Sequence, residues 1–208
     1  MKKLLTILFV IILKSSYAQL FVGAAYGTFN NPGSGYSFRG TAPTFMVEYV
    51  SEDDAAFFLN ASLYKKSINT YSQDVYDNNG TFIGTSKTTE TYNYKYLQLG
   101  FKRSLVGDFS DSRVNWFAGA GAMVGFVNAS SKDDYLGNVS DSYKYHYIIG
   151  GFSFNTGIQF RIKRVVLETK GNLDLSLKPI VAANSGGYIG AYTLTSLRAG
   201  VLIPLTKW

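Results

Sequence analysis

The segment from Val165 to Leu177 constrains the fold of this chain more than any other stretch. Val165 and four leucines share one phase of a two-residue period within it. The other phase consists of Glu168, Lys170, Asn172, Asp174 and Ser176. Successive side chains of a strand point to opposite faces, whereas a helix would mix the two classes around its circumference. We therefore predict a strand with one charge-free face and one polar, ionised face.

The first residues have the layout of a secretory signal peptide. Lys2 and Lys3 form a basic start, the run from Leu4 to Leu13 is almost wholly apolar, and small residues precede a cleavage position after Ala18. A membrane anchor is the alternative, but a spanning helix needs about twenty apolar residues. We predict a signal peptide over residues 1–18 and a single exported domain over residues 19–208.

The composition of the exported part favours a closed β-barrel. Removing Lys2, Lys3 and Lys14 lowers the formal net charge from +6 to +3, which gives no case for nucleic acid. The chain has no cysteine, 21 glycines, 16 tyrosines and 15 phenylalanines. An exported chain of this kind has no disulfide framework and needs another way to protect its strand edges, which closure of the sheet provides.

Eight segments alternate in this way. They are predicted at 20–29, 41–50, 55–68, 91–103, 113–127, 142–162, 165–177 and 188–203. The long connection 69–90 contains Asn78-Asn79-Gly80, a tight-turn signal, and is predicted to form a hairpin extension. The connection from Asn128 to Asp141 is interpreted as a polar, acidic loop. Short and long connections alternate, which places the short turns in the periplasm and the long loops outside.

A soluble barrel would alternate too, so the orientation of the faces must be decided separately. The mixed face is crowded with glycines, which a narrow eight-strand interior requires. The apolar face carries no charge in the middle of any segment, as expected for contact with lipid, where a Lys or Arg costs about 2–4 kcal/mol. The predicted fold is all-β: an eight-stranded antiparallel up-and-down transmembrane β-barrel with a polar, filled interior. Segments three to six are long enough to project beyond the membrane as an exposed sheet.

The charged residues of the mixed face are then candidates for a buried ion-pair network, because buried charges persist only when they are paired. The predicted members are Glu48, Lys102, Arg161, Glu168, Lys170, Asp174 and Arg198. An eight-strand interior has room for side chains but not for a water channel. A porin is therefore not expected.

His146 is the single histidine and the one candidate for catalysis. A general base needs an orienting partner, and the sequence indicates none. In barrels that resemble lipid A deacylases a serine follows two residues later, whereas this chain has Ile148. The favoured interpretation is an interfacial histidine among tyrosines. No metal-ligand spacing is evident, and no cofactor is predicted.

The pattern as a whole resembles the small outer-membrane β-barrel family, the OmpX/OmpA-like eight-strand barrels, and is most similar to the Bacteroidota-type outer membrane protein beta-barrel domain. The resemblance rests on SYAQ at the signal peptide, GAGAMVGF, ETKGNLDLS and the terminal TSLRAGVLIPLTKW. The family's last strand usually closes on a terminal aromatic. Trp208 supplies it here, although Pro204 and Lys207 depart from the pattern.

The expected function is that of a non-enzymatic surface component of the bacterial outer membrane. We expect a structural or adhesion-type protein that binds partners through protruding strands and extracellular loops. One alternative is an accessory barrel of a secretion or transport machine, and another is a lipid-modifying enzyme that uses His146. The expected partners are outer-membrane lipid and surface or envelope proteins, and the chain is expected to be a monomer.

Overall fold

The computed structural model describes residues 19–30, 39–52, 54–135, 138–177, 181–183 and 193–205. The predicted signal peptide lies outside these residues. The strands within them are β1 (Gln19–Asn30), β2 (Arg39–Glu52), β3 (Ala55–Tyr76), β4 (Phe82–Val106), β5 (Val114–Tyr135), β6 (Asn138–Ile162), β7 (Val165–Ser176), β8 (Val181–Ala183) and β9 (Thr193–Pro204). No helix in the described part of the chain is long and apolar enough to cross a membrane.

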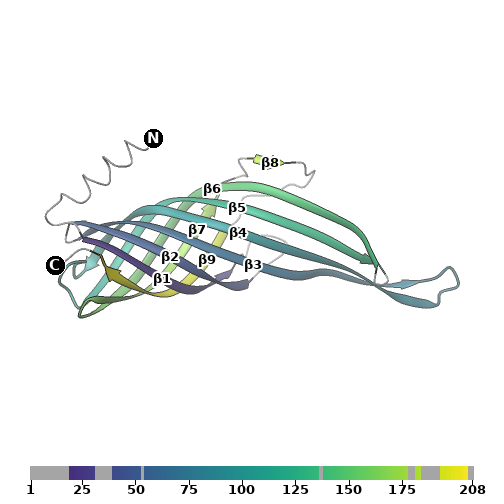
Figure 1. Ribbon diagram of the computed structural model, residues 1–208, viewed down its shortest axis with the longest axis horizontal. Coiled ribbons are helices and arrows are strands. Elements are labelled where there is room, and N and C mark those ends of the chain that lie inside the picture. Colours follow the sequence, from purple (N-terminus) through teal and green to yellow (C-terminus); the bar gives the residue numbers. More distant parts are fainter. Residues whose placement is uncertain are drawn as a thin grey trace.

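All strand pairs are antiparallel, and the sheet closes on itself. The order is β5-β4-β3-β2-β1-β9-β7-β6, and a further pairing of β5 with β6 completes the ring. The short β8 pairs with His146–Ile148 of β6, just beyond the residues of β6 that pair with β7. This arrangement confirms the predicted eight-stranded barrel, whose tilted strands are seen from the side in Figure 1.

The two ends of the barrel differ. At the turn end, β1 begins beside the end of β9, where the Leu205 N–H donates to the carbonyl of Leu20 at 2.7 Å. The short connections β2–β3, β4–β5 and β6–β7 lie at this end. At the opposite, projecting end, β3 to β6 continue well past the other strands (Figure 1).

The wall of the barrel is apolar outside and polar inside, as the alternation predicts. In β7, Leu167, Leu173 and Leu175 are about two-fifths exposed, whereas Glu168 and Asp174 are at most 3% exposed. Exposure of these leucine side chains to water would be unfavourable, whereas their contact with lipid hydrocarbon is not. The exterior is therefore a lipid-facing surface.

Glycines allow the interior to close around large side chains. A Cβ at Gly100 would lie 2.6 Å from the Phe58 ring, and one at Gly157 would lie 2.7 Å from the Phe117 ring. Distances this short between carbon atoms are forbidden. The predicted need for small residues inside a narrow barrel is met at these two positions.

The strands at the projecting end are longer than the sequence patterns indicated. The connection 69–90 is the predicted hairpin extension, with β3 and β4 paired up to Tyr76 and Phe82 and Gly80 in its turn at φ +78°. The prediction of a loop from Asn128 to Asp141 is wrong, because β5 runs on to Tyr135 and β6 starts at Asn138. The two strands pair along this polar stretch.

Candidate functional site

Four of the predicted network residues meet in the middle of the barrel. Lys102 on β4 donates to Glu48 on β2 at 2.6 Å and to Glu168 on β7 at 2.8 Å. Lys170, two residues along β7, has its Nζ 3.0 Å from the other oxygen of Glu168. Gln159 Nε2 donates to Glu168 at 2.8 Å and to Glu48 at 3.2 Å. The cluster ties four strands together across the lumen.

Aromatic rings line the cations of this cluster. The Lys102 ammonium lies 4.3 Å from the centroid of the Phe117 ring, and Lys170 lies 5.1 Å from that of Phe58. Such contacts contribute about 2 kcal/mol when both groups are desolvated. With each carboxylate held by a lysine and each lysine also facing a ring, the cluster is built to hold its charges in place.

Asp174 and Arg198 are buried in the same lumen but form no salt bridge within 4 Å among the described residues. One oxygen of Asp174 accepts from Gln98 at 2.8 Å, and the Arg198 guanidinium lies 5.1 Å from the centroid of the Phe29 ring. Arg198 stands opposite Lys170 in the β7–β9 register, and Asp174 lies four residues further along β7.

Arg161 does not belong to the central network, contrary to the sequence-based prediction. It lies near the turn end of β6, where its guanidinium donates to the main-chain carbonyls of Phe109 and Ser110. These carbonyls belong to the β4–β5 turn, which folds back toward the lumen. Because Arg161 stands close to the end of its strand, the turn is nearer to it than the carboxylates of the barrel centre.

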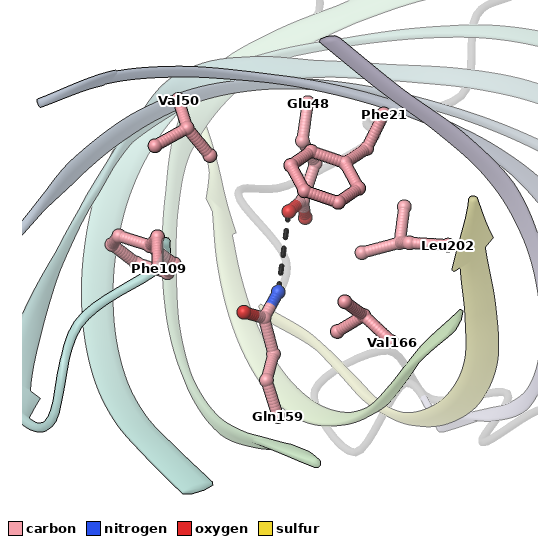
Figure 2. A pocket seen from close by; sticks show the side chains of 7 residues that line it. All are labelled: Phe21, Glu48, Val50, Phe109, Gln159, Val166 and Leu202. Atoms are coloured by element: carbon pink, nitrogen blue, oxygen red, sulfur yellow. Dashed lines mark hydrogen bonds between the residues drawn. The ribbon is translucent and has the colours of Figure 1, made fainter. Parts of the chain in front are cut away.

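The β4–β5 turn closes the turn end with Phe109. This ring is 2% exposed and packs against Phe117 at a centroid distance of 6.2 Å. Figure 2 shows Phe109 with Phe21, Val50, Val166 and Leu202 around Glu48 and Gln159, which point toward each other. The apolar side chains fill this end and separate the ion pairs from solvent.

Asp108 organises the same turn. Partial burial alone would raise the pKa of its carboxyl, but hydrogen bonds from the N–H groups of Asp111 and Ser112 and from the hydroxyls of Ser112 and Ser110 outweigh burial and lower the pKa below its ordinary value of 3.8. The ionised carboxylate therefore stabilises the loop that carries Phe109.

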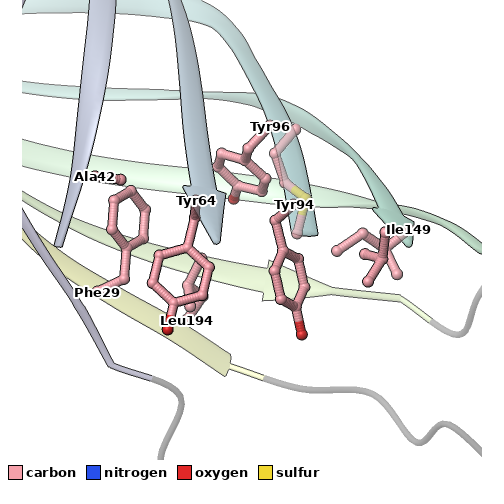
Figure 3. Close-up of a cluster of buried hydrophobic side chains, with 9 residues drawn as sticks. Phe29, Ala42, Tyr64, Tyr94, Tyr96, Ile149 and Leu194 are labelled. Carbon is pink, nitrogen blue, oxygen red and sulfur yellow. The ribbon is translucent and has the colours of Figure 1, made fainter. Parts of the chain in front are cut away.

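A second apolar cluster closes the projecting end of the lumen. Phe29, Tyr64 and Tyr94 lie side by side, with successive ring centroids 6.1 Å and 5.7 Å apart, and Ile149 and Leu194 complete the layer (Figure 3). The interior thus has three layers: aromatic, ionic and aromatic.

His146 lies outside the lumen, on the outer face of β6. Its Nδ1 is 2.6 Å from the side-chain oxygen of Asn128 on β5, and both residues are exposed. Neither a carboxylate nor a hydroxyl is hydrogen-bonded to the ring among the described residues. The described part also contains no group of three His, Cys, Asp or Glu side chains that could hold a metal ion.

The remaining candidate is the projecting sheet, which we define as residues 63–76 of β3, 82–95 of β4, 126–135 of β5 and 138–148 of β6. The register of β2 with β3 extends only to the pair Thr44–Ser62, just before this sheet begins. On the other side, β7 pairs with β6 only from Gly151, and β8 covers His146 to Ile148. From Asn138 to Tyr145, the described residues show pairing of β6 with β5 alone.

No family model and no curated protein matches the chain. Several solved structures are similar to it. Neisserial surface protein A (NspA) superposes with a TM-score of 0.55 at 16% identity, covering 89% of this chain and 97% of that one. Ail, the attachment invasion locus protein of Yersinia pestis, gives 0.54 at 10% identity over 90% and 99%. A major outer membrane protein from Thermus thermophilus gives 0.52 at 13% identity over 91% and 100%.

At these identities the likeness establishes the fold. The shared architecture and the inside-out wall define this chain as a small eight-strand outer-membrane β-barrel. The localisation predicted from the sequence, the bacterial outer membrane, agrees with both observations.

Sequence patterns did not reveal the apolar layers. Phe109 stands alone in a polar turn, where no period can show that its ring points inward. Tyr64 and Tyr94 fall on the polar phase of their strands, and the alternation does not show that they gather at one level. Tyr143, Tyr145 and Tyr147 share the phase of Gly151 and Ser153 in the sequence, which predicts an inward direction, but their side chains lie outside the described part of the structure.

Proposed function

We propose that the protein is a non-enzymatic surface protein that binds partner proteins along the edge of β6 in the projecting sheet. The proposal takes the projecting end as extracellular, because the short turns of outer-membrane barrels face the periplasm. The main support for this proposal is the position of β8. This short strand from elsewhere in the chain already pairs with β6 at His146–Ile148 and so marks the edge as one that accepts a strand.

The next stretch of the same edge is suited to strand addition. Along Asn138 to Tyr145 the backbone pairs with β5 on one side, and no described strand pairs on the other. N–H and C=O groups of alternate residues on such an edge point away from the sheet and can bind an extended segment of another protein. A partner strand would continue the line of β8 toward the tip of the hairpin.

Two further observations support a binding role over catalysis. The polar groups of the lumen are sealed by Phe109 and by the tyrosine layer, and His146 is hydrogen-bonded to an amide rather than to a carboxylate. The fold is also that of Ail, which is named for attachment and invasion. This likeness supports, for this chain, a role in contacts at the cell surface.

The test shortens one hairpin at a time. In the first variant residues 132–142 are replaced by Asn-Gly, which joins the paired residues Ser131 and Tyr143. In the control, residues 73–86 are replaced in the same way, joining Ser72 and Lys87 of the other hairpin. A shift in gel migration between unheated and heated samples verifies that both barrels fold.

Attachment of cells that display each variant is then compared. We expect the β5–β6 variant to lose attachment and the β3–β4 variant to retain most of it. Full attachment by the first variant, or equal loss by both, contradicts the proposal. A stable complex that co-purifies in detergent regardless of the first deletion instead favours the accessory barrel of a secretion or transport machine.

A further inference from the structure

A cationic patch lies on the outer wall at the level where the lipid-facing surface ends. On β3, the exposed apolar face runs through Phe57, Leu59 and Leu63 and is followed directly by Lys65. On β4 it runs through Phe101, Leu99 and Leu97 and is followed by Lys95. Both lysines are exposed and continue the lipid-facing phase of their strands.

The register brings these two lysines together. Lys65 pairs directly with Asn93, and Lys95 stands two residues further along β4, opposite Leu63. Lys65 and Lys95 are thus diagonal neighbours on one face, about 7–8 Å apart at their Cα atoms. Asn93, which is opposite Lys65 and two residues from Lys95 on the same face of β4, can add amide donors to the two ammonium groups.

Nothing in the described structure neutralises this pair. The salt bridges among the described residues include neither Lys65 nor Lys95. The acidic residue nearest along β4, Glu90, lies on the opposite face, where it accepts from the Tyr92 hydroxyl. Two ammonium groups at diagonal positions of one face repel each other, and an anion bound between them would remove this repulsion.

The position of the patch identifies that anion. Ala55 and Arg103 pair at the turn end, and Lys65 lies ten residues above this pair on β3 and Lys95 eight residues above it on β4. A tilted strand crosses the hydrocarbon core in about 9–11 residues. The ammonium groups therefore reach the level of the lipid headgroups on the projecting side, where phosphates are the available anions.

We propose that Lys65, Asn93 and Lys95 form a binding site for the phosphate of an anionic lipid headgroup in the leaflet on the projecting side. The acyl chains of such a lipid would lie along Leu63, Leu97 and Leu99 directly below. The site is separate from the β6 edge, and its existence does not depend on the partner-binding role proposed above.

The experiment follows lipid binding by NMR. The barrel is folded in micelles of a zwitterionic detergent and titrated with dihexanoyl phosphatidic acid, and the backbone amide shifts of residues 63–67 and 91–97 are recorded. We expect saturable shifts confined to this region. A lysine near a membrane surface contributes about 1 kcal/mol to anionic lipid binding, so the K65Q/K95Q double variant should bind roughly 25-fold more weakly.

Three comparisons make the result specific. K87Q removes the same charge from the same face of β4, about 26 Å further out, and should change the affinity less than twofold. The K65R/K95R variant keeps the charge and should keep the affinity. Glycerol 3-phosphate carries the phosphate without acyl chains and should bind at least tenfold more weakly than the lipid.

Unchanged affinity in K65Q/K95Q, an equal loss in K87Q, or shifts spread over the whole barrel would overturn the proposal. Equal binding of glycerol 3-phosphate would also overturn it, because the patch would then recognise free phosphate and not a lipid. Migration of the unheated double variant as a folded barrel excludes loss of structure as the cause of weaker binding.

Discussion

Strands β3 to β6 pass through two environments, and the difference between their barrel halves and their projecting halves shows what decides the chemistry of a strand. In the barrel, each strand separates lipid from a packed lumen, and its faces alternate strictly. In the projecting sheet beyond the layer of Tyr64 and Tyr94, no described side chain is buried, and Ser, Thr, Lys and Asp occupy either face. The same ladder of backbone hydrogen bonds runs through both halves.

The two halves also differ in what holds them together. The barrel half is closed, so each strand has two neighbours, and side chains from opposite walls meet inside it. The projecting half has pairing and a few side-chain contacts, such as the Thr88 hydroxyl donating to Asp133 at 2.7 Å and the Tyr76 and Phe82 rings at 5.9 Å. We therefore expect changes in the barrel to affect global stability and changes in the sheet to remain local.

The largest effect is expected from Lys102→Met. This change leaves the Glu48 carboxylate buried without a cation within 4 Å among the described residues, and Glu168 keeps only Lys170. Breaking a buried ion pair from one side costs about 3–5 kcal/mol. The free energy of unfolding, measured with guanidinium in lipid vesicles, should fall by this amount. Lys87→Met, on the same strand in the projecting half, should change it by less than about 0.5 kcal/mol.

Equal effects of the two lysine substitutions would show that the barrel does not depend on its ionic layer. The comparison between the two halves would then lose its energetic basis. A fall with Lys102→Met that is fully restored by a second substitution, Glu48→Gln, would locate the cost in the unpaired carboxylate.

The barrel half could be predicted from the sequence and the projecting half only in part. Both outcomes depend on whether the two faces of a strand meet different environments. Lipid outside and packing inside impose a two-residue period, which is visible in Val165 to Leu177. Solvent on both faces imposes none, so Asn128 to Asp141 looked like a loop although it pairs as strand. The β3–β4 extension was predictable because Asn78-Asn79-Gly80 is a turn signal that does not depend on burial.

The sequence indicated which charged residues lie in the lumen but not which of them contact each other. The phase of each strand assigned Glu48, Lys102, Glu168 and Lys170 to the lumen, where the structure brings them together. The phase does not give the level of a residue along the barrel axis. Arg161 was therefore grouped with residues of the barrel centre, although it lies beside the turn that carries Phe109.

An intermediate effect is expected from two glycine substitutions, one in each half. Gly157→Ala places a Cβ 2.3 Å from the carbonyl oxygen of Thr169 and 2.7 Å from the Phe117 ring, so the barrel must shift at a cost of about 1–3 kcal/mol. Gly80→Ala meets no atom within 4 Å, but its φ of +78° strains an alanine by about 1 kcal/mol.

The measurement separates global from local opening. Gly157→Ala should lower the free energy of unfolding of the whole barrel. Gly80→Ala should leave it unchanged and accelerate amide hydrogen exchange only within about 74–85 of the β3–β4 hairpin. Faster exchange throughout the barrel in Gly80→Ala would mean that the projecting sheet and the barrel unfold as one unit.

The smallest effect is expected at the turn that closes the barrel, and it depends on pH. Hydrogen bonds hold the pKa of Asp108 below its ordinary value of 3.8, so the ionised form stabilises the folded turn. A carboxyl with a depressed folded pKa contributes its stability above the unfolded pKa and loses it as the pH falls through the folded value. Asp108→Asn should therefore lower stability by about 1 kcal/mol at pH 7.

The difference in unfolding free energy between the original protein and Asp108→Asn should stay constant from pH 7 to pH 5 and shrink below about pH 4. Taking this difference removes the contribution of the other carboxyl groups, which titrate in both proteins. A difference that shrinks already between pH 7 and pH 5 would contradict a lowered pKa. Because Asp108 lies at the turn end, the same substitution should leave hydrogen exchange in the projecting sheet unchanged, whereas a change there would show that closure of the lumen by Phe109 is coupled to the far end of the strands.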